Sequence, residues 1–292
     1  MTRLPELGPV GIWSPELRFG DPAETVDAAA ELDELGFGTL WIPDVGGPVL
    51  ESVERLLRAT PRTKVATGIL NVWMHEAVDV AEGQERLERD FAGRFLLGLG
   101  ISHAPIVDAD QPGRYRRPLA TMREYLDALD AATAESSRPA RVLAALGPKM
   151  LELARDRTLG SHPYLVPVEH TAGAREALGP DRLLAPALSA VLAQDPGAAR
   201  AIAREDLATY LQLPNYTNAW RRLGYGDADL ASGGSDRLLD SLYALGDAER
   251  IAERVREHRE AGADHVCVRV VNAAAPRLPR AEWRELAAAL IV

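Results

Sequence analysis

The residues best placed to do chemistry follow a glycine-containing apolar run, residues 93–103, with the sequence GRFLLGLGISH. Two glycines spaced by one residue are followed by a hydroxyl, Ser102, and an imidazole, His103. Because glycine has no Cβ, a buried strand that ends in glycines lets a ligand approach its backbone closely. The run does not match a dinucleotide fingerprint, since the third glycine is missing and Pro105 interrupts the expected start of a helix. We therefore expect the end of a strand that faces a ligand of another kind.

The elements that must position these residues are short apolar runs that alternate with amphipathic segments. The predicted strands cover residues 10–13, 39–42, 64–70, 95–99, 142–146, 164–166, 183–191 and 265–271. The predicted helices cover residues 22–35, 49–59, 77–91, 119–134 and 148–156, a segment that begins near Thr171, a long region after residue 191, and residues 280–290. Short strands separated by helices predict a parallel sheet. Eight such units favour an α/β fold of the closed (β/α)8 TIM-barrel type over an open sheet.

One connection is longer than the others, residues 211–245, in the seventh unit. Its asparagines and glycines are typical of breaks between short helices, and a connection of this length is unusual in a compact domain. We predict a single barrel domain over residues 1–292 with a helical insertion at 211–245. The insertion is either a lid over the barrel or a surface excursion without function.

In a barrel of this kind the functional site lies where the strands end. The residues that follow the predicted strands are Trp13, Ser14, Asp44, Asn71, Trp73, His75, Gly100, Ser102, His103, Gly147, His170 and Thr171. The histidines come from different units and form no helix-spaced pair, so we predict no metal site. A Gly-x-Ser-x-Gly elbow and a phosphate-binding P-loop are also missing from the sequence.

Two positions could hold an anion at this end of the barrel. Gly147 precedes a predicted helix start, and Thr171 is a candidate N-cap whose following backbone amides could bind a negative group. A glycine within residues 67–71 predicts a bulge in the third strand. Each feature has an ordinary structural explanation, but together they favour a flat cofactor that carries a phosphate.

Composition restricts the classes of partner. The formal net charge of −10 argues against nucleic acids and anionic membranes. A single cysteine, Cys267, excludes a disulfide within the chain and is expected to be a buried apolar residue. The sequence contains no apolar run long enough to span a bilayer, and its first residues lack a signal-peptide core, so we expect a cytoplasmic protein.

Six motifs in order connect the chain to a known family. They are residues 34–44 (ELGFGTLWIPD), 66–71 (ATGILN), 93–100 (GRFLLGLG), 118–126 (PLATMREYL), 146–150 (LGPKM) and 261–266 (AGADHV). With them the chain resembles, over nearly its whole length, the luciferase-like flavin and deazaflavin oxidoreductases, and within these the branch that uses coenzyme F-420. The resemblance implies a (β/α)8 barrel with an insertion near the seventh strand, and a homodimer.

The resemblance also implies roles for individual residues. Asp44 would lie beside the deazaflavin ring. Gly68 and Ile69 would form a bulge behind the ring, which in this family often contains a non-prolyl cis peptide. The ring and side chain of the cofactor would be lined by Asn71, Gly100 and Ser102, and its phosphate end by Leu146, Gly147 and the helix start at Thr171.

The chain departs from the family's sugar-phosphate dehydrogenases at two positions. Val45 replaces a histidine after the aspartate, and Ile101 replaces a glutamate after the glycines, which makes a sugar-phosphate substrate doubtful. Our candidate for a proton-donating residue is His103, because an imidazole titrates near neutral pH. His75 is the alternative, and a structural role would explain either histidine.

Trp13 and Trp73 could form an apolar wall for the substrate, with core packing as the competing explanation. The function predicted is hydride transfer between ring carbon five of F-420 and a small organic substrate, since the cofactor supplies the difficult chemistry. The alternatives are an FMN-dependent luciferase-like monooxygenase and a non-catalytic homologue that binds flavin or deazaflavin. A metal-dependent barrel hydrolase is a more distant alternative function.

Overall fold

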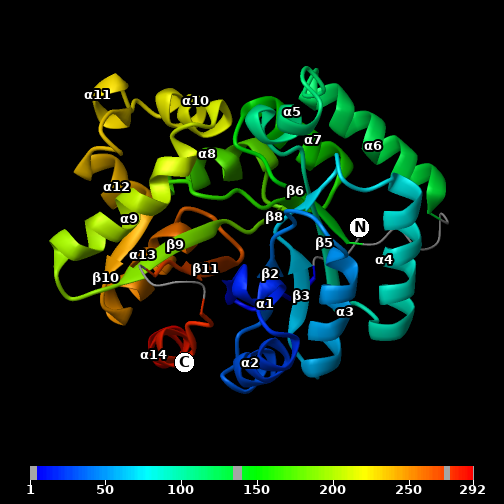
Figure 1. Cartoon of the computed structure of the whole chain (residues 1–292), viewed down its shortest axis with the longest axis horizontal. Helices are drawn as coiled ribbons and strands as arrows, with labels where there is room; N and C mark the ends of the chain where they lie inside the picture. The colour runs from blue at the N-terminus through cyan, green and yellow to red at the C-terminus, as the bar shows by residue number, and fades with distance from the viewer. Residues whose placement is uncertain (1–4, 134–139, 273–276, 292) are drawn as a thin grey trace.

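The computed structural model describes residues 5–133, 140–272 and 277–291 (Figure 1). Its strands are β1 (Val10–Trp13), β2 (Thr39–Ile42), β3 (Lys64–Thr67), β4 (Leu70–Asn71), β5 (Phe95–Gly100), β6 (Arg141–Leu143), β7 (Gly160–Ser161), β8 (Leu183–Leu184), β9 (Ala187–Leu192), β10 (Tyr243–Gly246) and β11 (Val266–Val270). All their pairings are parallel, as expected for short apolar strands joined by helices.

The sheet closes through the seventh unit. Pairing runs in the order β11–β1–β2–β3–β5–β6–β7–β8, and β9, which continues the chain directly after β8, pairs with β11. Pro186 lies between β8 and β9 and cannot donate to a ladder, so the strand breaks there while still joining both neighbours. The predicted (β/α)8 barrel is confirmed.

The helices are α1 (Glu16–Phe19), α2 (Pro22–Glu34), α3 (Val49–Ala59), α4 (Ala77–Phe91), α5 (Ala104–Asp110), α6 (Pro118–Ala132), α7 (Pro148–Arg157), α8 (Val168–Leu178), α9 (Pro196–Tyr210), α10 (Pro214–Arg222), α11 (Asp227–Leu230), α12 (Asp236–Leu242), α13 (Ala248–Glu260) and α14 (Arg280–Leu290). The Asp21 side chain accepts hydrogen bonds from the amides of Ala23 and Glu24, so α2 begins where its N-cap predicts. Residue 134, the end of the helix predicted over residues 119–134, lies outside the described residues.

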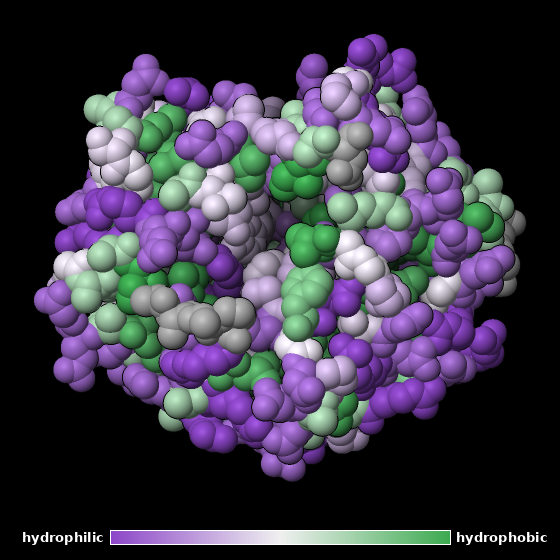
Figure 2. Space-filling view, in the orientation of Figure 1, coloured by the Kyte–Doolittle hydropathy of each residue, from purple (hydrophilic) through white to green (hydrophobic). Residues whose placement is uncertain are grey.

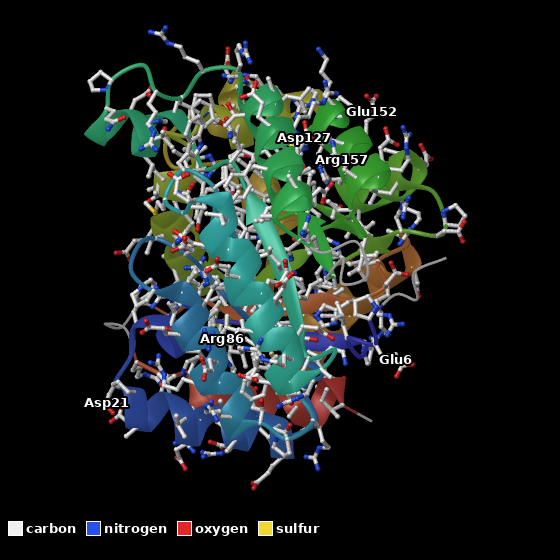
Figure 3. All side chains as sticks on the ribbon, turned by 90° about the vertical axis from the view of Figure 1, so that its right-hand side faces the viewer. Glu6, Asp21, Arg86, Asp127, Glu152 and Arg157 are labelled. Carbon is white, nitrogen blue, oxygen red and sulfur yellow. The ribbon has the colours of Figure 1, made fainter. Side chains whose placement is uncertain are left out.

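The helices cover the barrel with one apolar face each. On α4, Val80, Ala81 and Leu87 are buried, while Arg86 points outward and pairs with Glu54 of α3. Figure 3 shows α4 and α6 side by side against β5, with their charged side chains on the outer surface. This division into an apolar inner and a charged outer face is what fixes helices of this length on a sheet.

Aromatic and histidine side chains fill the inside of the barrel. The rings of Trp41 and His162 stack with centroids 4.1 Å apart, and the Trp41 indole donates to Nε2 of His265 at 3.1 Å. Burial lowers the pKa of His162 and of His265 to about 4, so both imidazoles are neutral packing residues. The barrel therefore has a packed floor beneath its mouth.

Four predicted strands differ from the structure. The strand predicted over residues 142–146 ends already at Leu143. Residues 164–166 are not a strand: the sixth strand is β7, and Tyr164 forms only one bridge, to Ala187. The apolar character of these residues reflects burial between Pro163 and Pro167 rather than pairing. The predicted third strand is interrupted at Gly68–Ile69, where the peptide bond is cis, and the predicted seventh is divided at Pro186.

The region 211–245 contains the predicted helical insertion. Helices α10, α11 and α12 follow one another, and Tyr216, Trp220 and Leu239 of this region share one apolar cluster with residues of α9 and β9. The region ends in β10, a strand that the sequence did not predict and that pairs with β9. In the described part of the chain, no helix combines the length and apolar character that crossing a bilayer requires.

Candidate active site at the carboxyl end of the barrel

The carboxyl ends of the strands open at the top of Figure 1, where α5 follows β5 and the insertion helices α10 and α11 lie opposite. Figure 2 shows a hollow in this upper central part, between the insertion on one side and the segments around α5 on the other. The predicted site residues that follow β1, β2, β4 and β5 all come to this end of the barrel. We refer to it as the mouth.

Asp44 is the centre of a polar clamp at the mouth. One of its oxygens, Oδ2, accepts from the amide of Asn71 at 3.0 Å and lies 2.8 Å from Nε2 of His75. The other oxygen accepts from the amide of Gly46 at 3.1 Å. Burial by itself would raise the pKa of the Asp44 carboxyl, but the hydrogen bonds from His75 and the two amides hold this pKa below its usual value. Asp44 is therefore an anion. It connects two other predicted site residues, Asn71 and His75.

The structure contains the bulge at Gly68–Ile69. The glycines of β5 leave the space that the bulge occupies. A Cβ on Gly100 would lie 2.3 Å from Cδ1 of Ile69, and a Cβ on Gly98 would lie 2.0 Å from the carbonyl oxygen of Thr67. The close approach predicted at these glycines is thus made by the neighbouring strand. On the other side, the Trp13 indole donates to the carbonyl of Gly68 at 2.8 Å, so Trp13 supports the bulge from within the barrel.

The loop after β5 carries Ser102 and His103 toward the insertion. The Ser102 carbonyl accepts from Nδ2 of Asn215 at 3.2 Å and from the Tyr115 hydroxyl at 3.3 Å. The His103 ring lies 5.3 Å from the ring of Tyr216, and its Nδ1 is buried without a hydrogen-bond partner in the described structure. The insertion therefore packs directly on this loop.

The prediction that His103 titrates near neutral pH is wrong. Burial lowers its pKa to about 4, because an imidazolium loses hydration under the insertion and gains no carboxylate partner. At neutral pH the ring is uncharged and keeps one N–H as a hydrogen-bond donor.

Trp73 joins the loops after β4 and β5. Its indole donates to the carbonyl of Ile101 at 2.7 Å, and its ring contacts Tyr115 at a centroid distance of 6.0 Å. The Arg114 guanidinium lies 5.5 Å from the same ring. A role for Trp73 in holding substrate stays a prediction.

At Leu146 and Gly147, where we predict the phosphate end of the cofactor, the structure places a cation that the sequence did not indicate, Arg222. The Leu146 carbonyl accepts from Nη2 of Arg222 at 3.1 Å, and the same nitrogen would lie 3.4 Å from a Cβ on Gly147. Gly147 is the N-cap residue of α7, and no side chain caps this helix. The start of α7 and the Arg222 guanidinium therefore lie close together at this corner.

The predicted N-cap at Thr171 is wrong. Helix α8 begins three residues earlier, after Pro167, and Thr171 lies within it. Its side chain is fully buried, with Oγ1 2.9 Å from Nδ1 of His258. Pro167 ends the preceding extended segment and starts the helix sooner than the hydroxyl suggested.

A second polar cluster at the mouth escaped the sequence analysis. Arg269 and Asp206 form a two-point ion pair with distances of 2.7 and 2.9 Å, and their side chains are 16% and 12% exposed. Arg269 also donates to the Tyr164 hydroxyl at 2.7 Å, and this hydroxyl lies 3.0 Å from that of Tyr210. The Tyr243 hydroxyl donates to Asp206 at 2.9 Å. The sequence contained one indication of this cluster: a charged residue, Arg269, within the largely apolar predicted strand 265–271.

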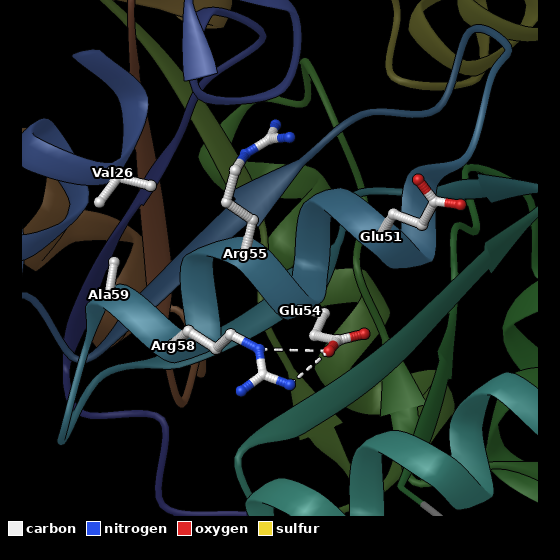
Figure 4. Close-up of a pocket in the computed structure, with 6 residues that line it drawn as sticks. All are labelled: Val26, Glu51, Glu54, Arg55, Arg58 and Ala59. Atoms are coloured by element: carbon white, nitrogen blue, oxygen red, sulfur yellow. Dashed lines mark hydrogen bonds and ion pairs between the residues drawn. The ribbon is translucent and has the colours of Figure 1, made fainter. Parts of the chain in front are cut away.

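Other features of the described residues do not compete with the mouth. They include no group of three histidine, cysteine or carboxylate side chains that could hold a metal ion. A depression of about 470 Å³ lies between α2 and α3, where Arg58 pairs with Glu54 on the outer surface (Figure 4). It is open and lined by side chains of the barrel's outer helices, so it is not part of the mouth.

Known proteins share both sequence features and the fold of this chain. The sequence profile of the luciferase-like monooxygenase family matches residues 8–265. The chain belongs to this family. A Mycobacterium tuberculosis protein to which coenzyme F-420-dependent oxidoreductase activity has been attributed is 24% identical to this luciferase-like chain over 163 residues. The match covers 55% of the chain and 45% of that protein, so it spans less than half of the relative.

Solved structures of the luciferase-like type share the fold. An F-420-dependent secondary alcohol dehydrogenase, solved with an F-420–acetone adduct, has a TM-score of 0.74 at 15% identity, with 97% of this chain and 98% of that one covered. The F-420-dependent tetrahydromethanopterin reductase from Methanopyrus kandleri has a TM-score of 0.69 at 13% identity, with 96% and 98% covered. The FMN-bound oxygenating constituent of 3,6-diketocamphane monooxygenase from Pseudomonas putida has a TM-score of 0.63 at 15% identity, with 90% and 92% covered.

Proposed function

We propose that the protein is an F-420-dependent oxidoreductase that transfers a hydride between the deazaflavin and a small organic substrate. The observation that carries this proposal is the Asp44 clamp beside the Gly68–Ile69 bulge, in a member of the luciferase-like family. When bound, F-420 supplies a hydride donor or acceptor at ring carbon five. The protein's part is to hold substrate and cofactor in reactive geometry and to exclude water.

The residues present fit such a cofactor. The start of α7, with Gly147 and Arg222, offers backbone amides and a guanidinium for an anionic group. The bulge backs the mouth at a position supported by Trp13. We assign cofactor contacts to Asn71 and Gly100, which end β4 and β5, and to Ser102 and Leu146 in the segments after β5 and β6.

Each side chain at the mouth then has a defined task. Asp44 fixes the loops that carry Asn71 and His75, because its carboxylate accepts from both. His103 is neutral, so it would orient a substrate oxygen by donating its ring N–H rather than by changing its protonation state. We assign Trp13, Trp73 and His75 to the substrate side of the mouth.

Titration of the purified protein with F-420 and with FMN tests the proposal. We expect deazaflavin fluorescence to be quenched on binding, and Asp44→Asn to weaken binding at least tenfold, while Asp236→Asn on the exposed face of α12 leaves it unchanged. Tight FMN binding without F-420 affinity would favour the monooxygenase alternative, which the fold shared with an FMN-bound enzyme keeps open.

A second measurement separates an enzyme from a non-catalytic homologue. Reduced F-420 is offered with a panel of ketones, enones and nitroaromatic compounds, and its reoxidation is followed optically. Turnover with any of them supports the oxidoreductase. Intact F-420 binding with no turnover in either hydride direction would favour a cofactor-binding homologue. We also propose a homodimer, to be checked by light scattering, and a cytoplasmic location, to be checked by fractionation.

A further inference from the structure

We propose that the mouth selects an uncharged, planar organic molecule, an aromatic or conjugated carbonyl compound, and that the insertion determines this selectivity. The inference deepens the proposed function and rests on it for the assignment of the mouth as a substrate site. It is carried by a continuous row of rings, which we call the aromatic wall, formed by Trp13, Tyr164, Tyr210, Tyr216 and His103.

The aromatic wall runs without a gap across the mouth. Ring centroids are 5.3 Å apart from Trp13 to Tyr164 and 5.6 Å apart from Tyr164 to Tyr210. They are 5.2 Å apart from Tyr210 to Tyr216 and 5.3 Å apart from Tyr216 to His103. These are the separations of favourable aromatic pairs. The five rings come from the ends of β1 and β5, the segment after β7, the end of α9 and α10, so only the closed barrel brings them together.

The wall is unusual for this chain, in which aromatic residues make up only 5%. Tyr164, Tyr210 and His103 are partly exposed, whereas Trp13 and Tyr216 are buried, so three of the five residues of the wall keep solvent-accessible surface. Stacking on such faces favours flat, polarisable ligands over bulky saturated ones.

The charges beside the wall are already paired. Arg269 lies 5.7 Å from the Trp13 ring, but its charge is matched by the two-point contact with Asp206. The Asp44 carboxylate already accepts hydrogen bonds from His75 and from the amides of Asn71 and Gly46. A carboxylate group on a substrate would have to leave water without a free opposite charge beside the wall, which is costly. What remains for recognition is a set of neutral hydrogen-bonding groups.

One such group is well placed to orient an oxygen. Nδ1 of His103 is buried and has no partner within the described residues. Asn215 holds the loop that carries His103 by donating to the Ser102 carbonyl and to the Tyr115 hydroxyl. A carbonyl oxygen at this end of the wall would complete the hydrogen bonding that His103 lacks.

The insertion supplies the ring that links His103 to the rest of the wall. Tyr216 belongs to α10, Tyr210 directly precedes the insertion, and Asn215 supplies the contact to the β5 loop. A shorter connection in the seventh unit would leave Trp13 and His103 as separate rings. We therefore assign substrate selectivity to α10.

Three methyl ketones of similar size test the proposal: acetophenone, 4-acetylbenzoate and cyclohexyl methyl ketone. Binding to the full chain is measured by ligand-observed NMR titration, with and without saturating F-420. We expect acetophenone to bind about tenfold more tightly than the anionic and the saturated analogue, because one aromatic pair and one unpaired charge are each worth about this factor. Equal affinities, preference for 4-acetylbenzoate, or binding of none of the three would overturn the proposal.

Variants within the insertion identify the origin of the selectivity. Tyr216→Leu should lower acetophenone affinity about tenfold and leave cyclohexyl methyl ketone unchanged, whereas Tyr216→Phe retains the preference. Tyr225→Leu is the matched control, because Tyr225 is as buried as Tyr216 and packs in the same cluster but is not in the aromatic wall. Circular dichroism verifies that each variant is folded. Equal losses in Tyr216→Leu and Tyr225→Leu would contradict the assignment.

The outcomes also separate this proposal from the preceding one. Selective acetophenone binding in a protein that does not bind F-420 would end the proposed function and leave the selectivity of the aromatic wall standing. F-420 binding with no discrimination among the ketones would do the reverse.

Discussion

Two sides of the barrel mouth are built in different ways. On one side, the Asp44 clamp uses residues from neighbouring loops, and two of the three groups bound to its carboxylate are backbone amides. On the other side, the Arg269–Asp206 cluster joins side chains that are 63 residues apart, and it includes Tyr164, which is 105 residues from Arg269. The clamp depends on neighbouring strand ends at most 31 residues apart in the chain, and the cluster depends on closure of the barrel and on the insertion.

We expect the largest loss of stability when the Arg269–Asp206 ion pair is broken. Asp206→Ala leaves the Arg269 guanidinium without its counter-charge in a site of low exposure. We expect the free energy of unfolding to fall by about 3–5 kcal/mol, the usual cost of breaking a buried ion pair from one side. Urea denaturation measures it. Asp236→Ala, which breaks the exposed pair with Arg204, should cost less than about 1 kcal/mol. Similar losses in both variants would show that the cluster is not a buried unit.

The clamp should be less costly to break. Asp44→Asn removes a charge that accepts from two amides and His75, and we expect a loss of about 2–3 kcal/mol at pH 7, since hydrogen bonds to a charged group are the strong ones. The pKa of Asp44 is lowered in the folded state, so its contribution is present above the unfolded pKa of about 3.9 and is lost as the pH falls through the folded value. Denaturation at several pH values should show a constant difference between variant and parent from pH 5 to 8. A difference that persists at pH 2 would argue against an ionised Asp44.

A glycine on the clamp side tests how tightly the bulge is packed. Gly100→Ala would place a Cβ 2.3 Å from Cδ1 of Ile69, and we expect it to destabilise the protein by about 1–3 kcal/mol through overpacking. The control is Gly173→Ala within α8, where a new Cβ meets nothing within 4 Å. This variant should be neutral or stabilising by up to about 1 kcal/mol. Thermal denaturation distinguishes the two, and an unaffected Gly100→Ala variant would mean that Ile69 can move.

The smallest effect concerns the state of His103 under the insertion. Its pKa of about 4 in the folded protein lies below the unfolded value of about 6.5, so the unfolded chain takes up this proton first and stability falls between about pH 6.5 and 4. NMR titration of the ring should show a neutral imidazole from pH 6 to 8. In Tyr216→Ala, which opens the cover, the pKa should rise toward 6.5. An unchanged pKa in this variant would locate the desolvation elsewhere.

The alternation of apolar and amphipathic segments was enough to predict the barrel and most helix boundaries. Helix α2 begins at its Asp21 cap and the strand β2 occupies its predicted residues, because capping and hydrophobic periodicity act over only a few residues. The motif around Gly68 predicted the bulge for a similar reason. The helix start, the strand and the bulge are each determined by residues in the same short segment of the sequence.

The protonation and partners of the site residues were decided only by the tertiary structure. His103 is neutral because α10 covers it, Thr171 is buried because α8 starts at Pro167, and Arg222 reaches Leu146 from a helix 76 residues away. Burial and charge pairing depend on which strand ends and loops meet when the sheet closes. Local sequence patterns do not specify which strand ends and loops come together. The aromatic wall and the Arg269 cluster form only because closure of the sheet brings these segments together.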